Sequence, residues 1–191
     1  MIDSLDFEKQ RINVTQGDIV YSISEDEQTA LISQIKSQES ELIFPRSIIH
    51  ESKEYIITGT FRQVLDKYSQ VKFIKFSKNS ELQFFGYLSF DRSSIESITI
   101  PSSTTIIGNM AFCDCEKLQQ IEFPSDSKLK KIGEFAFSGT MVKKLTIPIN
   151  LIEIDNYAFK SCKQLQCVEI PTDSKIQIIV KTHFVAHQLK S

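Results

Sequence analysis

The chain has 191 residues, of which 41% are hydrophobic and 24% charged, the composition of an ordinary globular protein of one or two domains. Its formal net charge of −2 excludes the basic footprint of a dedicated nucleic-acid binder. No apolar run approaches the roughly 20 residues that span a bilayer, and Asp3, Asp6 and Glu8 stand where a signal peptide has basic residues. We therefore expect a soluble chain without a signal peptide, which favours the cytoplasm.

Residues 1–60 do not follow the pattern that fills the rest of the chain. Apolar and polar residues alternate from Asp18 to Ile23, which predicts a half-buried strand, and a second strand is expected over Glu54–Thr58. The segment Leu42–Pro45 resembles the strand that closes each of the later repeats. Because the end of a solenoid would otherwise expose its apolar core, we interpret 1–60 as an N-terminal capping region.

A repeated motif fills residues 61–191. Phe90, Phe112, Phe137 and Phe159 follow one another at 22, 25 and 22 residues, and the motif around each is similar. Clear copies cover about 82–171, and degenerate coils stand at both ends, the last of them around Phe184. Self-similarity at such a period indicates a solenoid in which each coil stacks on its neighbours.

The motif assigns a role to each of its positions. All five prolines end an apolar, strand-like run, because proline lacks the N–H that a strand ladder needs. Gly86, Gly108 and Gly133 share one position, where we expect a turn with positive φ that leads into a short helical turn. The sequence therefore predicts an α/β solenoid with one short strand and one short helical turn in each coil of 22–25 residues.

The strands present two rows of outward side chains, which are the candidate binding face. The alternation of a strand turns the residues between the inward ones toward solvent. One row is Lys75, Thr99, Glu122, Thr146 and Glu169, and the other is Phe73, Ser97, Gln120, Lys144 and Cys167. Neither row is an aromatic stripe or a patch of one sign, so the rows indicate no particular ligand.

The cysteines and histidines do not form a recognisable metal or catalytic site. Cys115 and Cys162 take the same place two coils apart, about 10 Å from each other, which is too far for a disulfide. They are interpreted as buried thiols, whereas Cys113 and Cys115 lack zinc-site spacing. His183 and His187 would share one face of a helix, but a C-terminal capping segment is the favoured interpretation over a metal site.

No nucleophile, base and acid converge in the pattern, and no phosphate-binding glycine loop is present. We therefore expect no catalytic residues, no cofactor and no bound metal. The remaining classes are protein-binding modules, which solenoids form readily because stacked coils make an extended surface.

The repeat resembles one known family. The order Gly108, Ala111, Phe112, Cys115, Leu118, Ile121 and Pro124, with a matching copy from Asp155 to Pro171, is similar to the BspA-type leucine-rich repeat of bacterial and protist surface proteins. The resemblance implies a leucine-rich solenoid and, for some members, adhesion or host-protein binding at the cell surface. The alternative is an intracellular scaffold for protein interactions. The identity of the protein partner and the oligomeric state stay open.

Overall fold

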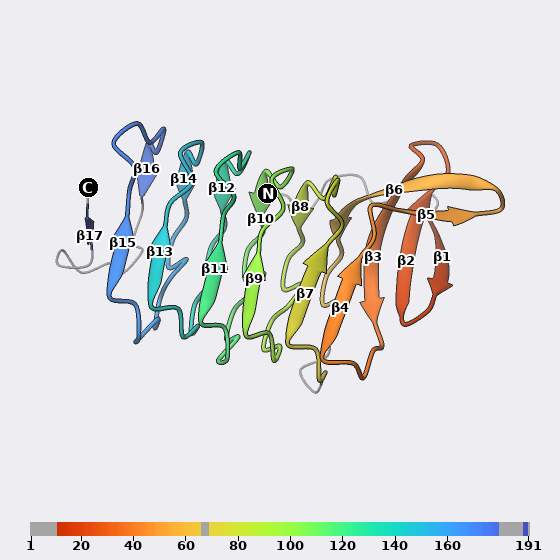
Figure 1. Ribbon diagram of the computed structural model, residues 1–191, viewed down its shortest axis with the longest axis horizontal. Coiled ribbons are helices and arrows are strands. Elements are labelled where there is room, and N and C mark those ends of the chain that lie inside the picture. Colours follow the sequence, from red (N-terminus) through yellow and green to blue (C-terminus); the bar gives the residue numbers. More distant parts are fainter. Residues whose placement is uncertain (1–10, 66–68, 180–188, 191) are drawn as a thin grey trace.

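The computed structural model describes residues 11–65, 69–179 and 189–190, and all regular elements in these ranges are β-strands (Figure 1). The strands are β1 (Arg11–Gln16), β2 (Ile19–Ser24), β3 (Thr29–Ile35), β4 (Glu41–Phe44), β5 (Ser47–His50), β6 (Lys53–Thr60), β7 (Phe73–Phe76), β8 (Phe84–Phe85), β9 (Ser97–Thr99), β10 (Ile106–Ile107), β11 (Gln120–Glu122), β12 (Lys131–Ile132), β13 (Lys144–Thr146), β14 (Glu153–Ile154), β15 (Cys167–Glu169), β16 (Ile178–Ile179) and β17 (Leu189–Lys190). The coils stack side by side along the long axis, as the solenoid prediction requires (Figure 1).

Each coil contributes two short strands to two different sheets. One sheet runs β1-β2-β3-β6-β8-β10-β12-β14-β16, with β5 paired to β6. On the other side lie a four-stranded sheet, β11-β9-β7-β4, and a three-stranded sheet, β13-β15-β17. The prediction of one strand per coil is therefore wrong, because the two-residue strand before each glycine, such as β10, pairs in parallel with its neighbours.

The expected helical turn is also wrong, since turns without a helix follow the motif glycines Gly86, Gly108 and Gly133. Backbone hydrogen bonds explain the difference. The N–H groups of Met110, Phe112 and Asp114 donate to carbonyls of the next coil at 2.7–2.8 Å. Met110 and Asp114 also have positive φ, 55° and 52°, which a right-handed helix cannot contain. The coil therefore uses this segment for stacking.

A column of phenylalanine rings fills the solenoid interior, as the motif predicted. Phe90, Phe112, Phe137 and Phe159 are buried, and successive rings stack with centroids 5.2, 5.2 and 5.5 Å apart and planes within 13°. The predicted inward residues of the strands, such as Ile98 and Leu145, are also buried. Aromatic pairs at this separation add to the free energy of burial, so the column is the main packing element of the repeats.

The reason for glycine at this position of the motif differs from the one expected. Gly86, Gly108 and Gly133 do not have positive φ; the described glycines that do are Gly17 and Gly139. A Cβ at Gly86 would lie 2.4 Å from the carbonyl oxygen of Thr60 in the preceding coil. In these three coils the position is glycine because neighbouring atoms approach too closely for a side chain, whereas the copy at Asp155 accommodates one.

The capping region is continuous with the solenoid. The expected strands over 18–23 and 54–58 appear as β2 and within β6. β1, β2 and β3 form an antiparallel sheet, and β3 then pairs in parallel with β6, which leads to β8. β4 pairs in parallel with β7, as the likeness of Leu42–Pro45 to a closing strand indicated. A boundary at residue 60 stays a prediction.

Ser89 offers a test of the small-residue position in the motif. It stands where later coils have Ala111, Ala136 and Ala158, and its buried hydroxyl has no hydrogen-bond partner among the described residues. Since an unsatisfied buried polar group is destabilising, we expect Ser89→Ala to raise the free energy of unfolding by about 1 kcal/mol. Urea denaturation at equilibrium measures this change. The reverse substitution, Ala111→Ser, should lower stability, and an equal gain from both would contradict the explanation.

Candidate functional site

The two predicted rows of side chains lie on the outward face of the sheets that contain β4, β7, β9, β11, β13 and β15. Phe73 pairs with Ser97, and Gln120 and Glu122 pair with Ser97 and Thr99, so both rows continue from β9 to β11 in register. Further along, Lys144 pairs with Cys167 and Thr146 with Glu169. The strand register thus aligns the ten predicted residues as expected, within each sheet.

The rows are interrupted between β11 and β13, which belong to different sheets. A hollow of about 550 Å³ lies at this step, and its lining includes Gln120, Glu122, Lys144 and Thr146. The predicted rows, which gain one residue in each coil, are therefore not continuous along the whole face. The repeat pattern could not reveal the break, because the strand residues keep the same spacing on both sides of it.

Charged groups on this outward face are paired with one another. The Lys75 Nζ lies 2.8 Å from Glu41 Oε1, and Lys144 Nζ lies 2.8 Å from Glu169 Oε1. The hydrogen bond from Lys144 to Glu169 and the charge of that carboxylate raise the pKa of the Lys144 amino group. Exposed pairs of this kind add little stability, but they balance the charge of the face.

Threonines also take part in this pairing. Thr99 Oγ1 donates to Glu122 Oε2 and Thr146 Oγ1 donates to Glu169 Oε2, each at 3.0 Å. Both threonines of the row therefore hold the carboxylate of the glutamate on the next strand. The face is polar and electrically balanced along most of its length.

The sequence reasoning missed two residues of the same face. Glu41 and Ile43 on β4 pair with Phe73 and Lys75, which extends both rows by one strand. The side chain of Ile43 is 63% exposed and that of Phe73 is 36% exposed. The likeness of Leu42–Pro45 to a closing strand was the signal that could have placed Ile43 in the row. Together, Ile43 and Phe73 give the N-terminal end of the face its apolar character.

The buried cysteines belong to a polar row in the core. Cys115 Sγ donates to the Phe90 carbonyl at 3.0 Å and lies 3.3 Å from Ser93 Oγ. Cys162 Sγ makes the same contacts with Phe137 and Thr140, at 3.1 and 3.3 Å. Ser93 and Thr140 therefore occupy the position of cysteine in the copies that lack it. Each thiol or hydroxyl in these two pairs has a partner, as buried polar groups require.

Burial raises the pKa of the Cys115 thiol to about 12 and also raises the pKa of Cys162. Since only the thiolate is a nucleophile, neither side chain should react in the folded protein at pH 8. We expect a short iodoacetamide treatment to alkylate Cys115 and Cys162 only after denaturation in guanidinium, as read by mass spectrometry. Alkylation of Cys115 in the native protein at the rate of the denatured chain would show that the core opens.

One cluster among the described residues has side chains of the kind that bind metals. Ligand atoms of Asp91, Cys113 and Asp114 lie within 4.8 Å of one another. Burial, followed by the nearby Asp114 and Asp91 carboxylates, raises the pKa of the Cys113 thiol to about 12. The guanidinium of Arg92 lies 3.8 and 3.9 Å from the two carboxylates, so a protein cation already offsets part of their charge. His183 and His187 lie outside the described residues.

Stacked coils of 22–25 residues with an interior phenylalanine column define the class of this protein, which is a leucine-rich-repeat solenoid. Residues 83–191 match the model of the BspA type leucine rich repeat region in six copies. The match covers more than half of the sequence, so the chain belongs to this family, as its motif indicated. Leucine-rich repeats of this family are generally modules that bind proteins and carry no catalytic site.

Solved structures of bacterial repeat proteins share the fold. The pneumococcal vaccine antigen PcpA superposes with a TM-score of 0.72 at 22% identity, over 85% of this chain and 51% of that one. A leucine-rich repeat protein of T. pallidum also superposes with a TM-score of 0.72, at 17% identity, over 89% of this chain and 82% of that one. A leucine-rich repeat protein of Bacteroides capillosus superposes with a TM-score of 0.55, at 22% identity, over 83% of this chain and 98% of that one. The chain spans about half the length of the PcpA chain.

At these identities the likeness shows the fold alone. The search of curated proteins found no significant match. Within the described residues, no helix has the length and apolar character needed to cross a membrane.

Proposed function

We propose that the chain is a non-catalytic module that binds another protein through its outward face, defined as the exposed side of β4, β7, β9, β11, β13 and β15. The observation that carries the proposal is the exposure of Ile43 and Phe73, two large apolar side chains, on adjacent strands. Large apolar groups that stay exposed in a folded protein mark interaction surfaces when they lie together. A protein partner would bury them at the centre of the contact, where most binding energy arises.

The rest of the face is polar and would form the rim of the contact around these two residues. Glu41 is opposite Phe73 and Lys75 is opposite Ile43, so the ion pair of Lys75 with Glu41 lies between the two apolar residues, which are diagonal neighbours. Hydrogen-bonded threonines and glutamates continue along the strands. Because the charges are already paired, a partner need not supply opposite charge to bind.

Binding to purified proteins tests this proposal. The immobilised chain should retain at least one protein from a panel of purified matrix, serum and cytosolic proteins. The double variant Ile43→Ser with Phe73→Ser should weaken that binding by about tenfold or more, since hot-spot truncations cost about 1–2 kcal/mol each. Ile149→Ser removes an exposed apolar side chain outside the face and is the matched control. Equal binding by the double variant and the wild type would exclude this face.

The cellular setting has two candidates. The BspA-type repeat, which is found in surface proteins, favours a surface protein with a role in adhesion, and free cysteines favour an intracellular scaffold. Antibody staining of the native protein in intact and in permeabilised cells separates the two. Signal on intact cells supports adhesion, whereas signal only after permeabilisation supports the scaffold.

A further inference from the structure

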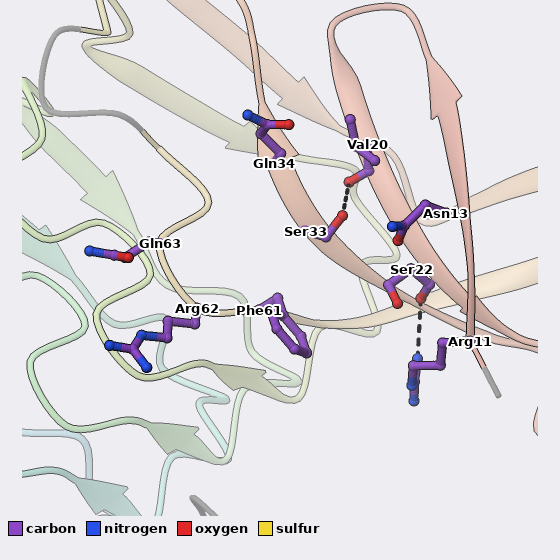
Figure 2. A pocket seen from close by; sticks show the side chains of 9 residues that line it. All are labelled: Arg11, Asn13, Val20, Ser22, Ser33, Gln34, Phe61, Arg62 and Gln63. Carbon is purple, nitrogen blue, oxygen red and sulfur yellow. Dashed lines mark hydrogen bonds between the residues drawn. The ribbon is translucent and has the colours of Figure 1, made fainter. Parts of the chain in front are cut away.

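A second surface feature lies on the capping region, away from the outward face. A hollow of about 640 Å³, here called the cap pocket, opens between the β1-β2-β3 sheet and the segment that follows β6. Figure 2 shows the cap side chains on one side of this hollow and those of the segment on the other, with the ring of Phe61 between them. The lining residues are Arg11, Asn13, Val20, Ser22, Ser33, Gln34, Phe61, Arg62 and Gln63.

The alternation of side chains along the strands explains which residues of the capping region line the pocket. Asn13 and Ser22 are directly opposed on β1 and β2, so they share one face of the sheet. The register of β2 and β3 shifts between Val20 and Tyr21, which leaves Ser33 as an extra residue on β3. Such a bulge turns a side chain that the alternation would direct elsewhere, and here both Ser33 and Gln34 reach the pocket.

Backbone hydrogen bonds hold the other wall in place. Phe61 N–H donates to the Ile32 carbonyl and Ile35 N–H donates to the Val64 carbonyl, each at 2.7 Å. Gln63 has a positive φ of 50°, an uncommon conformation for a residue other than glycine. The segment is thus tied to β3 on both sides of Arg62 and Gln63, so the pocket is formed before a ligand arrives. A preformed site loses less entropy on binding.

The lining is cationic and rich in groups that form hydrogen bonds, and none of its residues is acidic. Arg62 lies over the Tyr87 ring, 5.1 Å from the centroid, and Arg11 donates to the Ser22 carbonyl at 3.1 Å. Glu27 lies outside the lining, and its Oε2 forms an ion pair with the Arg11 guanidinium at 3.9 Å. Two arginines therefore belong to the lining, one ion-paired with Glu27 and the other stacked over Tyr87, and a ligand carboxylate would compete for either guanidinium. Guanidinium groups bind carboxylates with two parallel hydrogen bonds.

The neutral lining residues narrow the class of ligand. The side-chain amides of Asn13, Gln34 and Gln63 each offer donors and an acceptor, as do serine hydroxyls, and this combination matches sugar hydroxyls, which also donate and accept. The side chain of Phe61 is 37% exposed and presents an apolar ring to the same space. A peptide strand would instead need apolar pockets for its side chains, and the apolar residues of this lining are Val20 and Phe61 alone.

We propose that the cap pocket binds a carboxylate-bearing sugar residue of a glycan. One of the two arginines pairs with the carboxylate, the amides and serines take the hydroxyl groups, and the ring of Phe61 packs against the sugar. This site is separate from the outward face, so the chain would contact a protein and an acidic glycan on different surfaces.

Titration with defined oligosaccharides tests the proposal. The full chain, labelled with ¹⁵N, is titrated with sialyllactose and with a glucuronate-containing disaccharide, and lactose serves as the neutral comparison. We expect saturable shifts of backbone amides at the lining residues, with at least tenfold weaker binding of lactose. Arg62→Gln should weaken the binding of both acidic sugars at least tenfold. Arg92→Gln, an exposed arginine outside the pocket, is the charge-matched control and should leave the affinity unchanged.

Three results would overturn the proposal. The first is no saturable binding of either acidic sugar, and the second is an equal loss of affinity in Arg62→Gln and Arg92→Gln, which indicates only general attraction. The third is equal binding of a short Asp- and Glu-containing peptide, which would mean that the pocket recognises charge and not sugar. Asn13→Ala gives a further check, because it leaves the charge of the pocket unchanged and should still weaken the binding of the acidic sugars.

Discussion

Phe137→Ala is expected to lower the free energy of unfolding by about 3–5 kcal/mol, the usual cost of truncating a buried phenylalanine. Its ring stacks on Phe112 at 5.2 Å and on Phe159 at 5.5 Å, so the substitution leaves a cavity with two unmatched ring faces. Neighbouring rings cannot close that cavity, because each is held by its own coil. Equilibrium denaturation in urea, monitored by circular dichroism, measures the change.

The matched control is Phe73→Ala, which removes the same atoms from the exposed face of β7. It should change the free energy of unfolding by less than about 1 kcal/mol, as surface substitutions generally do. Equal losses from Phe137→Ala and Phe73→Ala would mean that the column does not dominate the packing. The motif also predicts a smaller loss for Phe184→Ala in the last, degenerate coil, and Phe184 lies outside the described residues.

Gly86→Ala is expected to destabilise the fold by about 1–3 kcal/mol, the range found for overpacked interiors. The new Cβ would meet the Thr60 carbonyl oxygen at 2.4 Å and the Phe61 carbonyl oxygen at 2.9 Å. Both are backbone atoms, so the coils themselves must move apart. Thermal unfolding should show a lower midpoint for this variant than for the wild type.

Asparagine distinguishes the two explanations for this glycine. At a position with positive φ, asparagine is better tolerated than alanine. At a crowded position asparagine is less well tolerated than alanine, because its side chain is larger. We expect Gly86→Asn to be less stable than Gly86→Ala. Gly17 is the control, because its φ is +57° and nothing lies within 4 Å of its added Cβ; there the order should reverse. The same order at both glycines would contradict the crowding explanation.

Several features of the fold were accessible from the repeat alone. The spacing of Phe90, Phe112, Phe137 and Phe159 predicted the interior column, because residues at one repeat position lie at one place in each coil. The alternation around Ile98 predicted which strand residues are buried. The candidate face followed from the same alternation, and the register of β9 and β11 aligns its residues as expected.

Other features depend on contacts between coils, which a single repeat does not contain. The segment after Gly108 has small and apolar residues typical of a helical turn, yet its N–H groups bond to the next coil. Glycine is compatible with both positive φ and close approach, so the residue type could not separate them at Gly86. The cap pocket required the β2–β3 bulge at Ser33, a register shift without a clear signal in the local pattern.

Amide hydrogen exchange tests the central claim, that the outward face is the protein contact, most directly. The chain would be measured alone and in complex with a purified protein that it retains. We predict slower exchange in the complex for peptides that contain β4, β7, β9 and β11, strongest around Ile43 and Phe73. Protection confined to peptides that contain β8, β10 and β12, on the opposite sheet, would contradict the claim.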